Sequence, residues 1–127
     1  MKIKNIYWII AGVINLLTAF LHLIGGQMSL VDPLSKSNLE LQVKTELLGV
    51  WHMVTVMLFM SSIVLLMFGL KPKEEISKAF ISFIAYSYVL FSICFIAAGI
   101  FNAQFAPQWT LLLPIGILTI IGKRKMI

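Results

Sequence analysis

The segment Leu48-Gly-Val-Trp-His-Met-Val-Thr55 opens an apolar run that continues without a charged residue to Gly69. A run of this length, about 20 residues, is what an α-helix needs to cross the hydrocarbon core of a bilayer. A second segment, Leu21-His-Leu-Ile-Gly-Gly26, closes an earlier apolar run near the N-terminus. Together the two segments hold both histidines of the protein, His22 and His52. They decide the fold and mark the place where a site is expected.

The composition of the chain is that of a membrane protein. Of its 127 residues, 60% are hydrophobic and 12% are charged, and the mean hydropathy is +0.97. Soluble proteins carry about twice that share of charge, roughly 25%, and a soluble domain of this composition would expose large apolar patches. We therefore predict a single transmembrane domain over residues 1–127, with the lipid bilayer as its main partner.

Four apolar runs predict an all-α fold, a polytopic membrane four-helix bundle, with helices at about residues 5–25, 38–69, 76–101 and 108–122. Gly25-Gly26 predicts the end of the first helix, and Asp32-Pro33 predicts a turn after it. Ser37-Asn-Leu-Glu40 has the form of a capping box and predicts that the second helix begins there. This helix exceeds the bilayer thickness, so we expect it to extend on the outer side, and Pro72 is expected to stop it.

The basic residues predict the topology. Of the ten, only Lys36 and Lys44 lie in the connection after the first run. The other eight flank the runs on one side of the membrane: Lys2, Lys4, Lys71, Lys73, Lys78, Lys123, Arg124 and Lys125. By the positive-inside rule this side is cytoplasmic, which puts both termini in the cytoplasm. Tyr7 and Trp8 lie at the same side, where interfacial aromatic residues are expected. The net charge of +5 is thus a topology signal, and no nucleic-acid partner is predicted.

Polar residues at helical spacing predict which helix faces turn into the bundle. Asn15, Thr18 and His22 are three and four residues apart, and His52 and Thr55 share a face of the next helix. Polar side chains are costly in lipid, so these faces should meet, with the two histidines at one depth in the outer leaflet. The predicted site is an outward-facing polar pocket with an aromatic rim, made by His22, His52, Asn15, Thr18, Thr55, Gln27, Trp51, Asn102, Gln108 and Trp109.

Several interpretations of the histidine pair are open. In the first, the protein is a small binding, sensing or accessory subunit that uses the pocket. In the second, His22 and His52 bind haem or a transition metal such as Cu or Zn. In the third, the protein transports a small molecule. In a purely structural interpretation, each histidine makes an interhelical hydrogen bond. The identity of a cofactor is left open.

Asn15 lies near the middle of the first predicted span. We expect it to make a packing hydrogen bond to Ser62 or to a hydroxyl of the third helix; the alternative is a polar path for transport. The apolar runs contain no Asp or Glu, which argues against coupled transport by a single chain. No serine has a histidine and an acid at its depth, so we predict no enzyme. Other membrane subunits or a homo-oligomer are the protein partners left open.

Three segments carry a resemblance to a known family: Trp51-His-Met-Val-Thr55, Pro107-Gln-Trp-Thr-Leu-Leu-Leu-Pro-Ile-Gly116 and Leu21-His-Leu-Ile-Gly-Gly26. With these segments the chain resembles a family of small, uncharacterised bacterial four-span membrane proteins, over nearly its whole length. The resemblance implies the fold and a bacterial inner-membrane location, and it implies no activity. The chain does not resemble the small multidrug exporters, because its first helix lacks their membrane-embedded Glu.

Overall fold

The computed structural model describes residues 4–71 and 74–125. Within these ranges the chain forms four long helices and two short helical segments. Their bounds are α1 Ile6–Gly26, the π-helical turn η1 Gln27–Val31, α2 Asp32–Lys36, α3 Leu41–Leu70, α4 Glu74–Phe101 and α5 Trp109–Arg124. The predicted all-α architecture with four main helices is confirmed.

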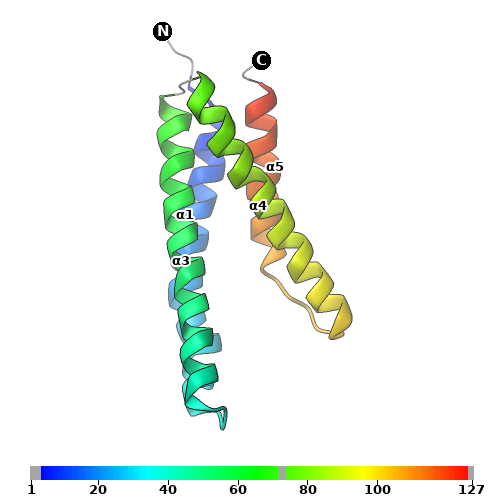
Figure 1. Cartoon of the computed structure of the whole chain (residues 1–127). Coiled ribbons are helices and arrows are strands. Elements are labelled where there is room, and N and C mark those ends of the chain that lie inside the picture. The colour runs from blue at the N-terminus through cyan, green and yellow to red at the C-terminus, as the bar shows by residue number, and fades with distance from the viewer. Residues whose placement is uncertain (1–3, 72–73, 126–127) are drawn as a thin grey trace.

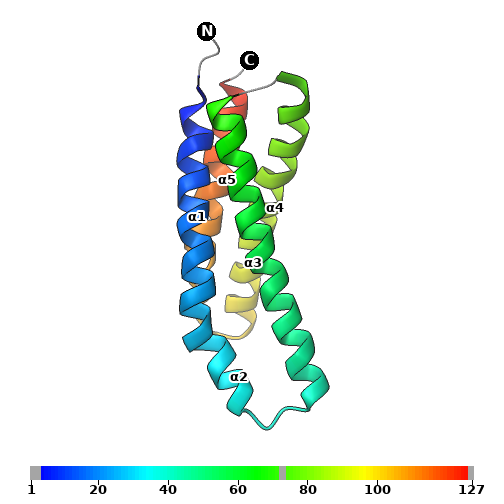
Figure 2. The same cartoon turned by 90° about the vertical axis from the view of Figure 1, so that its left-hand side faces the viewer.

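In the part of the chain that the structure describes, three segments are long and apolar enough to cross a membrane: Ile6–Lys36, Leu41–Leu70 and Lys78–Phe101. The fourth helix, α5, has 16 residues, about 24 Å of helix, against a hydrocarbon core of about 30 Å. α1 begins and α5 ends at the same end of the bundle (Figures 1 and 2). The protein is a helical, multi-pass membrane protein in contact with the bilayer.

The helices are arranged as two antiparallel hairpins, α1 with α3 and α4 with α5 (Figure 1). The hairpins are joined mainly where α1 packs against α5, whereas α3 and α4 make few contacts. Figure 1 shows the hairpins diverging toward the end that holds the connection from α2 to α3. The largest fully buried apolar side chains are Trp8, Tyr88, Leu65, Ile81 and Ile115.

The first helical segment is longer than predicted. α1 ends at Gly26, where the glycine pair predicted an end, but Gly26 has helical backbone angles and η1 and α2 continue the helical path to Lys36. The predicted turn at Asp32-Pro33 is wrong, because Pro33 lies in the first turn of α2, where a helix does not need the missing N–H. The wider π turn before it is closed by the N–H of Asp32, which donates to the carbonyl of Gln27.

The predicted capping box at the start of the second long helix is also wrong. The Oγ of Ser37 donates to the carbonyl of Leu34 at 2.7 Å and so closes the end of α2. α3 then begins at Leu41 without a side-chain cap. Its 30 residues make roughly 45 Å of helix, which exceeds the bilayer core as predicted. The expected stop at Pro72 lies outside the described residues, as do Lys2 and Lys73 of the basic set.

Buried polar contacts hold the end of the bundle where α1 begins. The Nε1 of Trp8 donates to the carbonyl of Thr119 at 3.1 Å. Asn5 caps α1 by accepting from the N–H of Trp8 at 3.3 Å, and its Nδ2 donates to the carbonyl of Gly122 at 2.8 Å. A Cβ on Gly122 would lie 2.5 Å from Cδ1 of Trp8. Trp8 is therefore a buried link between α1 and α5, and its predicted place in an interfacial aromatic belt is wrong.

Candidate functional site

His22 of α1 and Trp51 of α3 form a stacked pair. Their ring centroids are 3.7 Å apart with an interplanar angle of 15°, and Nε2 of His22 lies 3.3 Å from the carbonyl oxygen of Trp51. Both side chains are half-buried. The indole lies against α1 at Gly26, where a Cβ would come within 1.8 Å of Cζ2 of Trp51. Gly26, the last residue of α1, therefore makes room for the tryptophan ring.

The hydrogen bond to Trp51 assigns the protons of His22. A carbonyl oxygen only accepts, so Nε2 carries the hydrogen, and in the neutral imidazole Nδ1 is then the bare acceptor. The same carbonyl accepts from Oγ1 of Thr55 at 3.1 Å, so the imidazole is joined to a fixed point of α3. The atom of His22 left for a ligand is Nδ1, which can accept from a donor or bind a metal ion.

The other predicted site residues of this hairpin are placed separately. Thr18 is buried and donates to the carbonyl of Ile14 at 2.8 Å, a bond within its own helix. Gln27 is exposed, and its Nε2 donates to Oδ1 of Asp32 at 2.8 Å. His52 is exposed, whereas His22 is half-buried, and no hydrogen bond in the described part of the chain joins the two imidazoles.

Three further predicted residues, Asn102, Gln108 and Trp109, lie at the far end of the other hairpin. Asn102 donates to the carbonyl of Ala98 at 2.8 Å, and Gln108 is exposed. Trp109 is half-buried and lines a cavity of about 510 Å³, whose other walls come from the end of α4 and the connection to α5. Figure 1 shows this end of the hairpin standing apart from the end of α1 and α3. The predicted residues therefore do not line one pocket, because the hairpins diverge.

Asn15, Ser61 and Tyr88 form a ring of hydrogen bonds that joins α1, α3 and α4. Nδ2 of Asn15 donates to Oγ of Ser61 at 2.9 Å, and the hydroxyl of Tyr88 donates to Oδ1 of Asn15 at 2.7 Å. Oγ of Ser61 and the hydroxyl oxygen of Tyr88 are 2.7 Å apart, which closes the ring when Ser61 donates. All three residues are buried. Bonds in such a ring polarise and strengthen one another.

The ring settles which partners Asn15 has. The expected bond to a hydroxyl of the third long helix is made by Tyr88, whereas Ser62 donates to the carbonyl of Gly12 at 2.9 Å. Sequence reasoning did not single out Ser61 as a partner, since adjacent serines point to different sides of a helix and spacing alone does not choose between them. Among the described residues, no buried side-chain nitrogen or oxygen lacks a hydrogen-bond partner. The described polar side chains that are buried in the middle of the bundle therefore all have hydrogen-bond partners.

The predicted alternative of a haem or metal site finds no geometric support. Within the described residues, no group of three or more His, Cys, Asp and Glu is placed to share a metal ion. A haem between His22 and His52 needs both imidazoles to face one open slot. Here the indole of Trp51 covers one face of the His22 ring, and His52 is exposed. Ligation by the pair stays a prediction from the sequence.

Comparisons with known protein families, with curated proteins and with solved structures find no match to this chain. The class of the protein therefore follows from its own features, which are those of a small helical multi-pass membrane protein.

Proposed function

We propose that the chain is a four-span protein of the bacterial cytoplasmic membrane, of the small four-span family that it resembles, with both termini in the cytoplasm. In this proposal it acts as a small binding, sensing or accessory subunit and uses His22, at the external end, to bind its ligand or partner. The observation that carries the proposal is the stacked pair of His22 and Trp51, which presents a bare imidazole nitrogen in a fixed, half-buried position.

The orientation is supported by charge. The end at which α1 begins and α5 ends holds Lys4, Lys71, Lys123, Arg124 and Lys125. Cytoplasmic ends of membrane helices carry such an excess of basic residues. The opposite end, with Asp32, Glu40 and Glu46 against Lys36 and Lys44, has a small negative balance. The long extensions of α1 and α3 then stand on the external side. The short helix α5 crosses the membrane either where the bilayer is locally thinner or where α1 and α4 shield it from the lipid.

Binding is favoured over transport by the centre of the bundle. A path for a polar solute through one chain would pass Asn15, Ser61 and Tyr88, whose polar atoms are already bonded to one another. The proposal includes no catalytic activity, because Nε2 of His22 is bonded to a backbone carbonyl and no carboxylate of the described residues is hydrogen-bonded to the ring.

Native mass spectrometry of gently solubilised membranes tests the binding role. We expect a stable complex with a ligand or partner chain that is lost in His22→Phe, which keeps a flat ring on Trp51 but removes the nitrogens. His52→Phe is the matched control and should keep the complex, since His52 is exposed and no hydrogen bond among the described residues joins it to His22. If the wild-type chain always runs alone, or if only His52→Phe loses the complex, the proposed role of His22 is wrong.

Thiol labelling tests the orientation. In a Cys94→Ala background, which removes the single cysteine, we place one thiol at each end as Ser35→Cys and Arg124→Cys. A membrane-impermeant maleimide should label Ser35→Cys in intact cells and Arg124→Cys only after the cells are opened. The reverse pattern would overturn the topology.

A further inference from the structure

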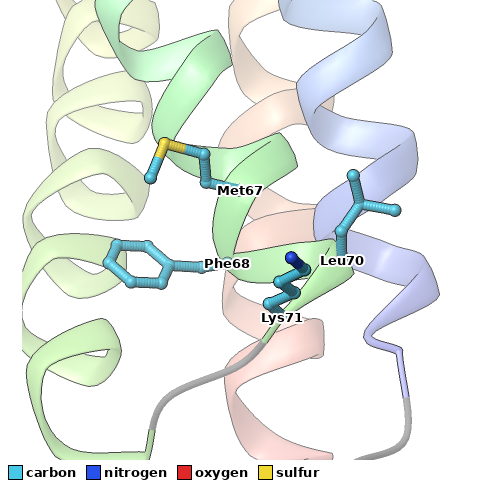
Figure 3. Close-up of a pocket in the computed structure, with 4 residues that line it drawn as sticks. All are labelled: Met67, Phe68, Leu70 and Lys71. Atoms are coloured by element: carbon cyan, nitrogen blue, oxygen red, sulfur yellow. The ribbon is translucent and has the colours of Figure 1, made fainter.

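The last turn of α3 and Lys71 after it line a cleft. This cleft lies at the opposite end of α3 from Trp51 and plays no part in the proposed binding by His22. The cleft has a volume of about 380 Å³ and is lined by Met67, Phe68, Leu70 and Lys71. Figure 3 shows Phe68 extending toward α4 and Leu70 toward α1, with Lys71 at the edge between them. Met67 and Leu70 are exposed and Phe68 is half-buried. The cleft thus has an apolar floor and one ammonium group at its rim.

The cleft lies at the strongly basic end of the molecule. Among the described residues, this end holds six basic residues, and Glu74 and Glu75 begin α4 beside them: Lys4, Lys71, Lys78, Lys123, Arg124 and Lys125. The structure holds the C-terminal cations close to the bundle: Nζ of Lys123 donates to Oγ of Ser82 at 2.6 Å, and Nζ of Lys125 lies 5.6 Å from the ring centroid of Tyr7. The positive electrostatic potential of these residues attracts an anionic group to this end.

We infer that this cleft binds one anionic phospholipid. Lys71 contacts the headgroup phosphate, and Met67, Phe68 and Leu70 contact the upper part of an acyl chain. The depth is right for such a molecule, because Leu70 ends an apolar span and Lys71 begins the connection that follows it. A basic pocket beside the end of a membrane helix is the arrangement that recognises anionic lipid headgroups. A free phosphate ion would contact only Lys71 in this cleft, whereas a phospholipid would also contact the apolar floor.

The test is native mass spectrometry of the full chain in detergent, titrated with dioleoyl phosphatidylglycerol or with dioleoyl phosphatidylcholine. We expect the first phosphatidylglycerol to bind more tightly than phosphatidylcholine, and Lys71→Gln to weaken it roughly fivefold, the effect of one lysine at a lipid surface. Met67→Ser should weaken both lipids, because it removes part of the floor. Glycerol 3-phosphate, which has the phosphate but no acyl chain, should not compete at equal concentration.

Two matched lysines make the inference refutable. Lys36→Gln removes the same charge from the opposite end, and Lys125→Gln removes it from the basic end outside the cleft. Both should keep most of the affinity for phosphatidylglycerol. Equal losses in Lys125→Gln and Lys71→Gln would mean a diffuse attraction without a site, and equal affinity for the two lipids would also overturn the inference. The result does not depend on the orientation in the cell or on His22, so it can fail while the proposed function holds.

Discussion

Replacing Tyr88 with Phe removes one hydroxyl from the centre of the bundle and isolates the contribution of the polar ring. The hydroxyl donates to Oδ1 of Asn15 at 2.7 Å and lies 2.7 Å from Oγ of Ser61. Ser61 is not left without a partner, because it also lies 2.6 Å from the carbonyl of Met57 and can donate there. Oδ1 of Asn15 has no such second partner among the described residues, and Asn15 is 0% exposed. Tyr88→Phe therefore buries one unsatisfied acceptor.

The magnitude follows from that single acceptor. An unsatisfied buried acceptor costs about 1–3 kcal/mol, and interhelical hydrogen bonds in membranes average about 0.6 kcal/mol with a maximum near 1.7. Turning the amide of Asn15 over does not help, since Nδ2 donates to the carbonyl of Leu58 and a carbonyl cannot donate in return. We expect Tyr88→Phe to lower the free energy of unfolding by about 1–2 kcal/mol.

The assay is equilibrium unfolding in mixed dodecylmaltoside and dodecyl sulfate micelles, followed by circular dichroism. Tyr86→Phe is the control, because it removes the same hydroxyl from an exposed position of the same helix and should change stability by less than about 0.5 kcal/mol. The double variant Asn15→Leu/Tyr88→Phe has no orphan acceptor, so it should cost about 1 kcal/mol less than the sum of the single variants. A loss in Tyr88→Phe no larger than in Tyr86→Phe, or strict additivity, would refute the ring.

Three further substitutions test other contacts by the same unfolding assay. Gly26→Ala should lower the free energy of unfolding by about 1–3 kcal/mol, because its Cβ would meet the ring of Trp51 at 1.8 Å. Gly25→Ala is the control: its Cβ meets nothing within 4 Å, so it should be neutral or stabilising. Equal effects of the two substitutions would contradict the packing of Trp51 against Gly26. Ala103 has a φ of 49° after the end of α4, so Ala103→Gly should stabilise by about 1 kcal/mol, and a loss would count against that turn. His22→Phe keeps an aromatic ring on Trp51 and should lower the free energy of unfolding by about 1 kcal/mol. His22→Ala also loses the stacking and should lower it further. The opposite order would count against the stacked pair.

The positions of the helices were predictable from the sequence because lipid offers no partner for backbone groups. Each apolar run must then satisfy its N–H and C=O groups internally, which a helix does. The errors fell on short motifs whose meaning depends on distant partners. Ser37 resembles a cap until its hydroxyl is found on the carbonyl of Leu34, and Gly26 ends α1 but also makes room for the ring of Trp51, which no local pattern indicated. Local pattern rules do not contain those contacts.

The site was predictable only as a set of polar helix faces. Helical spacing placed Asn15, Thr18 and His22 on one side of the first helix, and the structure turns that side toward α3, with Asn15 and Thr18 buried and His22 against Trp51. The predicted equal depth of His22 and His52 did not indicate which ring stacks on His22, because depth says nothing about rotation around the helix axis. One imidazole is stacked and the other is exposed.

The sequence by itself determined that Leu48 to Gly69 and three other apolar runs form helices, and it predicted that eight of the ten basic residues flank these runs on one side of the membrane. The apolar composition of a segment indicates that lipid surrounds it, and the helical spacing of its residues indicates how its backbone is hydrogen-bonded. Both are local properties of the sequence. Tertiary structure alone decided that Tyr88 closes a ring with Asn15 and Ser61, that Trp51 rather than His52 covers His22, and that the two hairpins diverge. These features arise from the packing of side chains between helices far apart in the chain, where a rotation or a change in crossing angle exchanges one partner for another.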